Sequence, residues 1–132
     1  MSYSNVHFIL FKPQLAENIG ACARALKNFN FSKLKIVSPK ISFPNEKVFA
    51  TSVGAKDIIN ASKVYSNFED AIKNTNCVIA TSSRIRKKNF KHLSLSELRK
   101  INFKQKIAIV FGPEASGLTN NELSYANYVI KL

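Results

Sequence analysis

The residues best suited to chemistry follow a buried-strand pattern near the end of the chain. Residues 107–111 are apolar without a break, as in a strand covered on both faces of a parallel sheet. Gly112 and Gly117 then enclose a short polar segment that contains Glu114 and Ser116. Glycines at such a turn let the backbone come close to a ligand. The stretch predicts one wall of a ligand-binding edge.

The spacing of the two glycines also occurs in phosphate-binding P-loops, but this turn lacks the P-loop cation. Leu118 and Thr119 stand where that motif has lysine followed by serine or threonine. No ammonium group is available there for phosphates, which excludes a P-loop nucleotidase. An ordinary turn after a buried strand remains an alternative to a ligand site. Thr119 and Glu122 have the spacing of a capping box, which predicts a helix over residues 119–126.

Two further polar segments follow predicted strands. After a strand at 6–11, a helix over residues 17–28 carries Asn18, Gly20 and Arg24 in its first two turns. A strand at 76–81 runs into Thr81, Ser82, Ser83 and Arg84. Ligands of open parallel sheets bind beyond the carboxyl ends of the strands. We therefore expect the three polar segments to meet at one edge of a sheet.

Strands that alternate with helices predict a single α/β domain over residues 1–132, with a parallel sheet and right-handed crossovers. Further strands are predicted at 34–37, 64–65 and from 128 onward, with short helices at 46–50, 56–61 and 68–73 and another beginning near 94. Residues 83 to about 94 are predicted to form a basic loop.

The net charge of +12, from 20 basic and 8 acidic side chains, is typical of a protein that binds a polyanion. Residues 84–106 contain nine basic side chains and one acid, so 23 positions carry +8 of this charge. The expected RNA contacts in this patch are Arg84, Arg86, Lys87, Lys88 and Lys91. Lysine outnumbers arginine 16 to 4, so a compositional bias and a solvated loop without a partner stay open as explanations.

Other classes of protein are disfavoured by composition. No apolar run approaches the roughly 18 residues of a membrane span, and the N-terminus lacks a signal-peptide pattern, so we expect a cytoplasmic protein without a membrane partner. Cys22 and Cys77 lack metal-ligand spacing and are expected to be buried thiols. With only His7 and His92 in the chain, no metal site is expected.

Taken together, the polar segments resemble the SpoU/TrmH branch of the SPOUT methyltransferases. Asn18-Ile19-Gly20 with Arg24 matches the pattern NxGxxxR, and residues 111–118 match FGxExxGL in the same order, about ninety residues later. The closest resemblance is to the TrmJ type, which methylates a ribose 2′-hydroxyl in the tRNA anticodon loop. The similarity spans residues 6–132.

The resemblance implies an α/β fold with a C-terminal trefoil knot, a homodimer, S-adenosylmethionine as cofactor and no metal. It implies tRNA ribose 2′-O-methylation at an anticodon-loop cytidine or uridine. The catalytic positions would be Arg24, Asn18 and Glu114, with Arg24 meeting the methyl donor of the other subunit. The cofactor would lie against Thr81, Ser82, Ser83, Gly112 and Leu132.

The chemistry constrains what the arginine does. Methyl transfer from a sulfonium to an alcohol needs in-line alignment and removal of a proton from the hydroxyl. Arginine is a poor base because its pKa exceeds about 12. We favour Arg24 as a bidentate grip on the adjacent phosphate, which orients the nucleophile while the phosphate or a neighbouring group takes the proton. The alternative for Arg24 is an ordinary surface arginine.

The sequence departs from the family after its last predicted strand. The third family motif, a proline-containing turn followed by a Ser-Leu-Asn helix start, does not occur before the final residue, Leu132. We therefore expect a C-terminally truncated domain with an incomplete knot, weak or absent cofactor binding, and no C-terminal RNA-binding extension. A catalytically silent basic RNA-binding module on the same scaffold is the alternative. A nonspecific basic protein, whose RNA affinity vanishes at modest salt, is a third.

Overall fold

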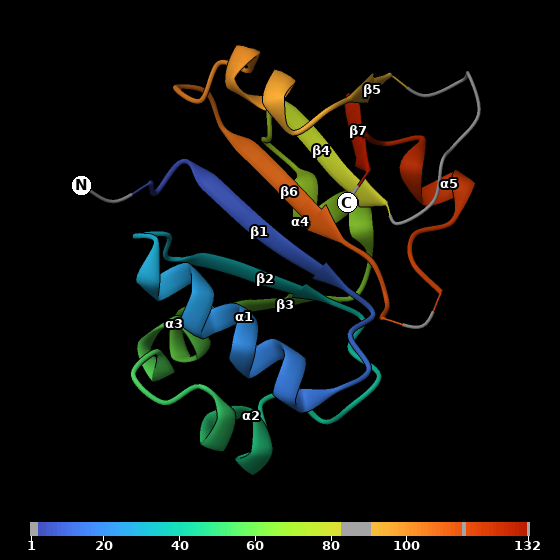
Figure 1. Cartoon of the computed structure of the whole chain (residues 1–132). Coiled ribbons are helices and arrows are strands. Elements are labelled where there is room, and N and C mark those ends of the chain that lie inside the picture. The colour runs from blue at the N-terminus through green and yellow to red at the C-terminus, as the bar shows by residue number, and fades with distance from the viewer. Residues whose placement is uncertain (1–2, 83–90, 115, 132) are drawn as a thin grey trace.

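A seven-stranded parallel sheet forms the centre of the computed structural model, which describes residues 3–82, 91–114 and 116–131. The strands are β1 (Val6–Phe11), β2 (Lys33–Val37), β3 (Lys63–Tyr65), β4 (Cys77–Ser82), β5 (His92–Leu93), β6 (Ile107–Phe111) and β7 (Tyr128–Lys131). Their order is β3-β2-β1-β6-β4-β7-β5, and every neighbouring pair is parallel (Figure 1). The predicted α/β class with a parallel sheet is confirmed.

Helices cover both faces of this sheet. The α-helices are α1 (Ala16–Asn28), α2 (Glu46–Thr51), α3 (Lys56–Ala61), α4 (Phe68–Ile72) and α5 (Asn120–Leu123), and residues Ser96–Lys100 form the 3₁₀ helix η1. Side chains of α1, α2 and α3 pack on one face, against Leu34 and Ile36. Side chains of α4 and α5 pack on the other, against Ile9 and Val110. Successive side chains of a strand point to opposite faces of the sheet, so the strands contribute residues to both cores.

Most predicted helices and strands begin and end close to the observed ones, because the sequence patterns that predict them involve only neighbouring residues. Thr119 accepts a hydrogen bond from the backbone N–H of Glu122, whose carboxylate accepts the N–H of Thr119, so the capping box is confirmed. Asn45 and Asn67 cap α2 and α4 in the same way, each accepting a backbone N–H three residues later. A short polar side chain before an apolar pattern thus begins these helices.

Two predictions about local structure were wrong. Residues His92–Leu93, predicted as part of the basic loop, form strand β5 beside β7, and the N–H of Val129 donates to the carbonyl of Lys91 at 2.9 Å. Two residues are too few to show alternation, and their pairing depends on a distant strand. The helix predicted to reach 126 ends at Leu123, and turn-type hydrogen bonds continue to Ala126.

Gly20 allows close packing between α1 and α2. A Cβ atom added at Gly20 would lie 2.7 Å from the carbonyl carbon of Thr51, the last residue of α2. A glycine inside a helix indicates close approach by a neighbouring group, and the approaching residue is Thr51, through its side-chain Oγ1 and Cβ as well as its backbone. Lys47 of α2 also pairs with Glu17 of α1 at 2.9 Å, so the two helices are joined at both positions.

Gly20→Ala is expected to lower the free energy of unfolding by about 1–3 kcal/mol, because the added methyl forces α1 and α2 apart. Urea denaturation followed by circular dichroism measures the change. The matched variant Gly20→Ala with Thr51→Gly removes the clashing side chain of Thr51 and should recover part of the loss. An alanine variant more stable than wild type, as helix propensity alone predicts, would contradict this packing.

The two cysteines are free thiols, and Cys77 is buried in the sheet as predicted. Cys22 is half-buried on α1, and the low polarity around it raises the pKa of its thiol to about 11. Within the described residues, no three His, Cys, Asp or Glu side chains gather as metal ligands. Among the same residues, no helix has the length and apolar content needed to cross a membrane.

Candidate functional site at the carboxyl edge of the sheet

The three polar segments meet where three adjacent strands end. Strand β6 lies between β1 and β4, so the residues that follow these strands share the carboxyl edge of the sheet. The backbone N–H of Gln14, after β1, donates to Oε2 of Glu114, after β6, at 3.0 Å. Thr81 Oγ1 at the end of β4 donates to the carbonyl oxygen of Val110 at 3.0 Å. The strand ends that precede the predicted segments therefore share one edge as expected, while Ser83 and Arg84 lie outside the described residues and the first segment is joined to this edge through Gln14, before Asn18.

The glycine turn folds back on itself. A Cβ atom at Gly112 would lie 2.6 Å from the backbone nitrogen of Leu118 and 2.7 Å from the carbonyl carbon of Gly117. Gly117 has φ of +70°, which favours glycine, and its N–H donates to the carbonyl of Pro113 at 2.8 Å. Leu118 is 2% exposed and anchors the end of the turn in the core. The conformation of the turn therefore requires a glycine at position 112.

Thr81 and Ser82 are buried polar residues at the end of β4. They are 9% and 7% exposed, although every other residue of this strand is apolar and buried. Their backbone pairs with Ile130 and Lys131 of β7, and the hydroxyl of Thr81 bonds to β6, so this part of the edge combines apolar walls with polar main-chain atoms. Two other predicted cofactor contacts, Ser83 and Leu132, lie outside the described residues.

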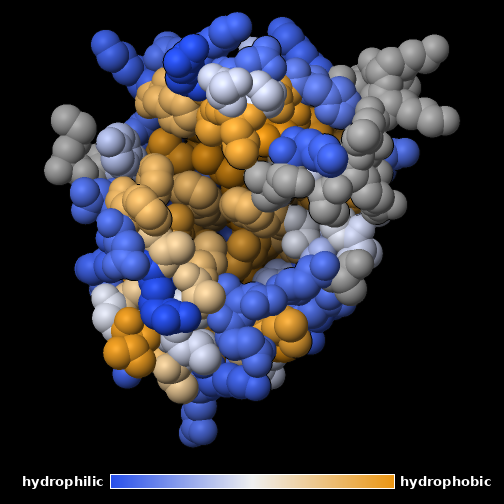
Figure 2. Space-filling model, viewed as in Figure 1, coloured by the Kyte–Doolittle hydropathy of each residue, from blue (hydrophilic) through white to orange (hydrophobic). Residues whose placement is uncertain are grey.

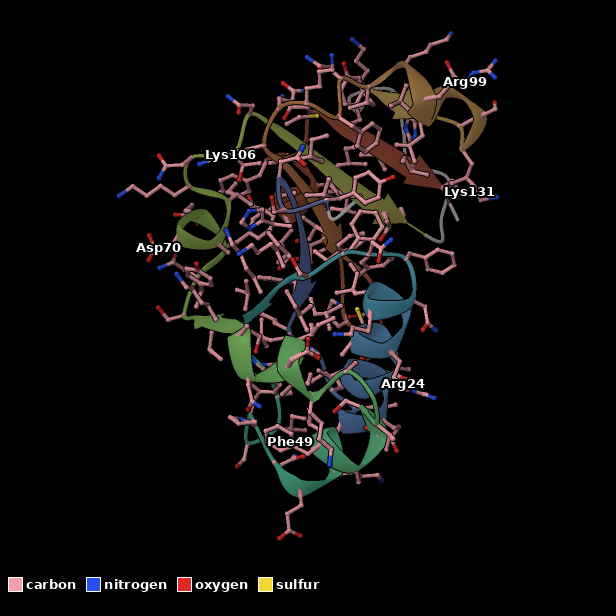
Figure 3. The ribbon with its side chains drawn as sticks, turned by 90° about the vertical axis from the view of Figure 1, so that its left-hand side faces the viewer. Arg24, Phe49, Asp70, Arg99, Lys106 and Lys131 are labelled. Atoms are coloured by element: carbon pink, nitrogen blue, oxygen red, sulfur yellow. The ribbon has the colours of Figure 1, made fainter. Side chains whose placement is uncertain are left out.

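The predicted catalytic residues are only partly brought together. Glu114 is exposed on the turn after β6 and is tied to the segment after β1 through Gln14. Asn18 is exposed near the start of α1, close to the same edge. Arg24 is exposed further along α1 and points into solvent (Figure 3). Among the described residues, no hydrogen bond or ion pair joins Arg24 to Asn18 or Glu114.

Of the predicted RNA contacts, only Lys91 falls within the described residues. Its side chain is exposed, and its ammonium lies over the ring of Tyr128, 5.1 Å from the centroid. This contact holds the charge at the start of β5, next to the amino end of β7. Arg84, Arg86, Lys87 and Lys88 lie outside the described residues, so their role as RNA contacts stays a prediction.

Sequence reasoning missed Gln14 as a member of the site. The contact with Glu114 uses the backbone N–H of Gln14, so the identity of its side chain carries no signal for it. The neighbouring Pro13 offered an indirect clue, because it ends the strand and places the next N–H at the edge of the sheet. Glu114 therefore connects two loops, in addition to any role in chemistry.

Comparisons with known proteins agree with these motifs. The sequence profile of the SpoU rRNA Methylase family matches residues 5–132. A Haemophilus influenzae protein named as an uncharacterized tRNA/rRNA methyltransferase is 37% identical over 135 residues, covering 97% of this chain and 53% of that protein. The tRNA (cytidine-2′-O-)-methyltransferase TrmJ of Methanocaldococcus jannaschii is 34% identical over 132 residues, with 96% of this chain and 57% of that protein covered.

The fold comparison points to the same group of proteins. The crystal structure of TrmJ from Z. mobilis ZM4 superposes with a TM-score of 0.88 at 29% identity, over 96% of this chain and 57% of that one. The chain spans about half the length of the curated relatives that it matches. Profile, identity and fold agree over almost every residue of the chain, so this protein belongs to the SpoU rRNA methylase family.

Proposed function

We propose that this chain forms the methyltransferase domain of an S-adenosylmethionine-dependent tRNA ribose 2′-O-methyltransferase. The observation that carries the proposal is the shared carboxyl edge of β1, β4 and β6, where Gln14, just before the NxGxxxR segment, bonds to Glu114 of the FGxExxGL turn and Thr81 bonds to Val110. Relatives named for tRNA 2′-O-methylation support both the reaction and the substrate. Cytidine or uridine in the anticodon loop is the proposed target, and the cytoplasm the proposed location.

The residues at the carboxyl edge fit the cofactor. S-adenosylmethionine has polar groups on an apolar adenosine framework, and the buried ends of β4 and β6 offer main-chain donors and acceptors beside apolar side chains. Thr81, Ser82 and Gly112 would hold the cofactor there, together with Ser83 and Leu132. The cofactor supplies an electrophilic methyl group. The role of the chain is to bind it, exclude water and orient the ribose hydroxyl for in-line attack.

The position of Arg24 supports a site shared by two subunits. Arg24 comes eight residues after Ala16, and at about 1.5 Å per residue it lies roughly 12 Å along α1 from the end that follows β1. Helix α1 leads away from the carboxyl edge, so Arg24 is separated from Thr81 and Gly112 of its own chain. In the proposed homodimer, each Arg24 completes the site of the other copy and grips an RNA phosphate.

An apolar hollow on the α1 face supports the homodimer. Figure 2 shows apolar side chains gathered in a hollow at the centre of this face. Phe8 and Leu10 of β1 are half-buried and pack with the α1 core, their register partners Ile109 and Phe111 on β6 are also half-buried, and the rings of Phe8 and Phe111 stack with centroids 6.4 Å apart. Apolar surface of this kind is stabilised when another chain covers it. A second copy of this chain, which would also deliver Arg24, is the proposed occupant.

The catalytically silent RNA-binding module is disfavoured, because the relatives are named as methyltransferases and the catalytic-motif positions Asn18, Arg24 and Glu114 are all present. The deciding experiment incubates the purified chain, and the same chain extended by the third family motif, with labelled S-adenosylmethionine and tRNA, because cofactor binding is expected to be weak without that motif. We expect label on the ribose of one anticodon-loop nucleotide, located by mass spectrometry of nuclease fragments. A matched tRNA with a 2′-deoxy nucleotide at that position should remain unlabelled. Label on a base, or none on tRNA, overturns the proposal.

A further inference from the structure

A polar cleft lies at the amino-terminal edge of the sheet, opposite the candidate functional site. It has a volume of about 330 Å³, which is at the lower end of the range for small-molecule sites, about 300–1,000 Å³. It is bordered by the starts of β1, β2 and β3, by the turn after α4 and by the residue before β6. Its basic lining side chains are His7, Lys33, Lys35, Lys63, Lys73 and Lys106.

The parallel register assembles this cluster from distant parts of the chain. His7 of β1 is paired with Lys33 of β2, and Lys35 of β2 is paired with Lys63 of β3. Lys33 and Lys35 are two positions apart, so both lie on the face covered by α4, where their neighbour Val37 is in the core. Toward the carboxyl ends this face is apolar, and at the amino ends it is basic.

The positive charge of the cleft is not balanced within the described residues. Five lysines line it, and its one carboxylate, Asp70, is already bonded to the side-chain amide of Asn67 at 3.1 Å. The ion pairs found in the described part of the chain, Lys27 with Asp57 and Lys47 with Glu17, lie elsewhere. Like charges held close together raise the local positive potential and attract anions.

Two inward groups give the cleft a defined shape. Lys35 Nζ donates to the carbonyl oxygen of Ala71 at 2.6 Å and lies 5.4 Å from the centroid of the Tyr65 ring, so its ammonium is held in place. Nδ1 of His7 is buried and has no hydrogen-bond partner among the described residues. Burial and the four lysines Lys35, Lys33, Lys106 and Lys63 lower the pKa of His7. An anion bound here would give this nitrogen the hydrogen-bond partner that it lacks and would lie beside the positively charged lysines.

We propose that this cleft binds phosphate groups. Lysine ammoniums recognise phosphate as point charges, and Lys33, Lys63, Lys73 and Lys106 are exposed and able to turn toward a bound group. Lys35 forms a fixed contact on the floor of the site. Nδ1 of His7 donates a hydrogen bond to the bound phosphate when this nitrogen carries a proton. The ligand is a phosphate ester or an inorganic oligophosphate.

The proposal is independent of methyl transfer. Figure 3 shows Asp70 and Lys106 on one side of the molecule and Arg24 on the other. The cleft lies at the amino-terminal edge of the sheet, whereas the candidate active site lies at the carboxyl ends of β1, β4 and β6. The phosphates belong either to an RNA backbone or to a small soluble anion. Binding assays on one pair of variants distinguish these two sources.

The experiment compares two double variants. The cleft variant carries Lys63→Gln and Lys106→Gln, and the control carries Lys47→Gln and Lys56→Gln. All four lysines are exposed, and the two proteins carry the same net charge. Pyrophosphate is titrated calorimetrically at low salt, and tRNA binding is measured by fluorescence anisotropy across a salt series. Melting curves confirm that both variants fold. The ring signals of His7 and His92, which are the only two histidines, are followed by NMR.

Pyrophosphate should bind the cleft variant about tenfold or more weakly than the control, because two charged contacts are lost. In the wild-type chain, pyrophosphate should raise the pKa of His7 and leave the signal of His92 unmoved. If RNA is the source, the tRNA salt slope of the cleft variant also falls by about 1.5. If it is a small anion, tRNA binding matches the control. Equal pyrophosphate affinities, or no binding at millimolar pyrophosphate, overturn the proposal.

Discussion

Arg24→Ala is expected to slow methyl transfer to tRNA by about 10²–10³, the usual cost of removing one donor that stabilises charge in a transition state. Arg24 is exposed and is separated from the core by its position on α1, so the melting temperature should stay within error of wild type. Single-turnover rates with labelled S-adenosylmethionine at saturating tRNA measure the effect. An unchanged rate in an otherwise active protein would show that Arg24 is an ordinary surface residue without a role in methyl transfer.

Two controls separate the roles of Arg24. Arg24→Lys keeps the charge and loses the bidentate fork, so its rate should fall between wild type and Arg24→Ala. Mixing Arg24→Ala with Gly112→Ala protein tests the shared site. A heterodimer contains one site with an intact turn and an intact arginine, so about a quarter of the wild-type activity should return for random pairing in a symmetric dimer. No recovery on mixing would place Arg24 in the site of its own chain.

Gly112→Ala is expected to weaken both the fold and the cofactor site. The new Cβ would meet the backbone of Gly117 and Leu118 at 2.7 and 2.6 Å, and backbone cannot rotate away as a side chain does. Leu118 must then leave its place in the core, at a cost of about 1–3 kcal/mol for overpacking. Denaturant unfolding and calorimetric titration with S-adenosylmethionine measure the two effects. We expect cofactor affinity to fall by at least about tenfold if the turn moves by 1 Å.

Gly117→Ala in the same turn is the matched control. A Cβ at Gly117 meets open space, and the cost is limited to the positive φ of +70°, about 1–2 kcal/mol. The turn keeps its path in this variant, so the cofactor affinity should change less than in Gly112→Ala. A Gly112→Ala protein as stable as wild type, or a larger affinity loss in Gly117→Ala, would show that the turn does not depend on this contact.

Particular residues show which features of the fold are encoded locally. The apolar run at Ile107–Phe111 became β6 with the predicted boundaries, and Thr119 and Glu122 formed the predicted capping box. Local hydrogen bonding and the burial of contiguous apolar side chains are sufficient for both. The meeting of the three polar segments could also be predicted, because the carboxyl ends of parallel strands share one edge.

Other features depend on contacts that the sequence pattern does not reveal. Strand β5 contains only His92 and Leu93, and it forms because β7 offers a free edge. The glycine at 20 indicated close packing, but Thr51 as the approaching residue followed only from the placement of α2. The bond from Gln14 to Glu114 uses a backbone group, which every residue except proline carries.

Motif spacing and hydrophobic periodicity were sufficient to predict the fold class, the family motifs and the positions of Asn18, Arg24 and Glu114, because neither depends on contacts between distant residues. The arrangement of these residues in space follows from the folded structure. Folding joined Glu114 to Gln14 and placed Arg24 well along α1. It also gathered lysines from 33 to 106 around His7, since strand register sets which side chains become neighbours.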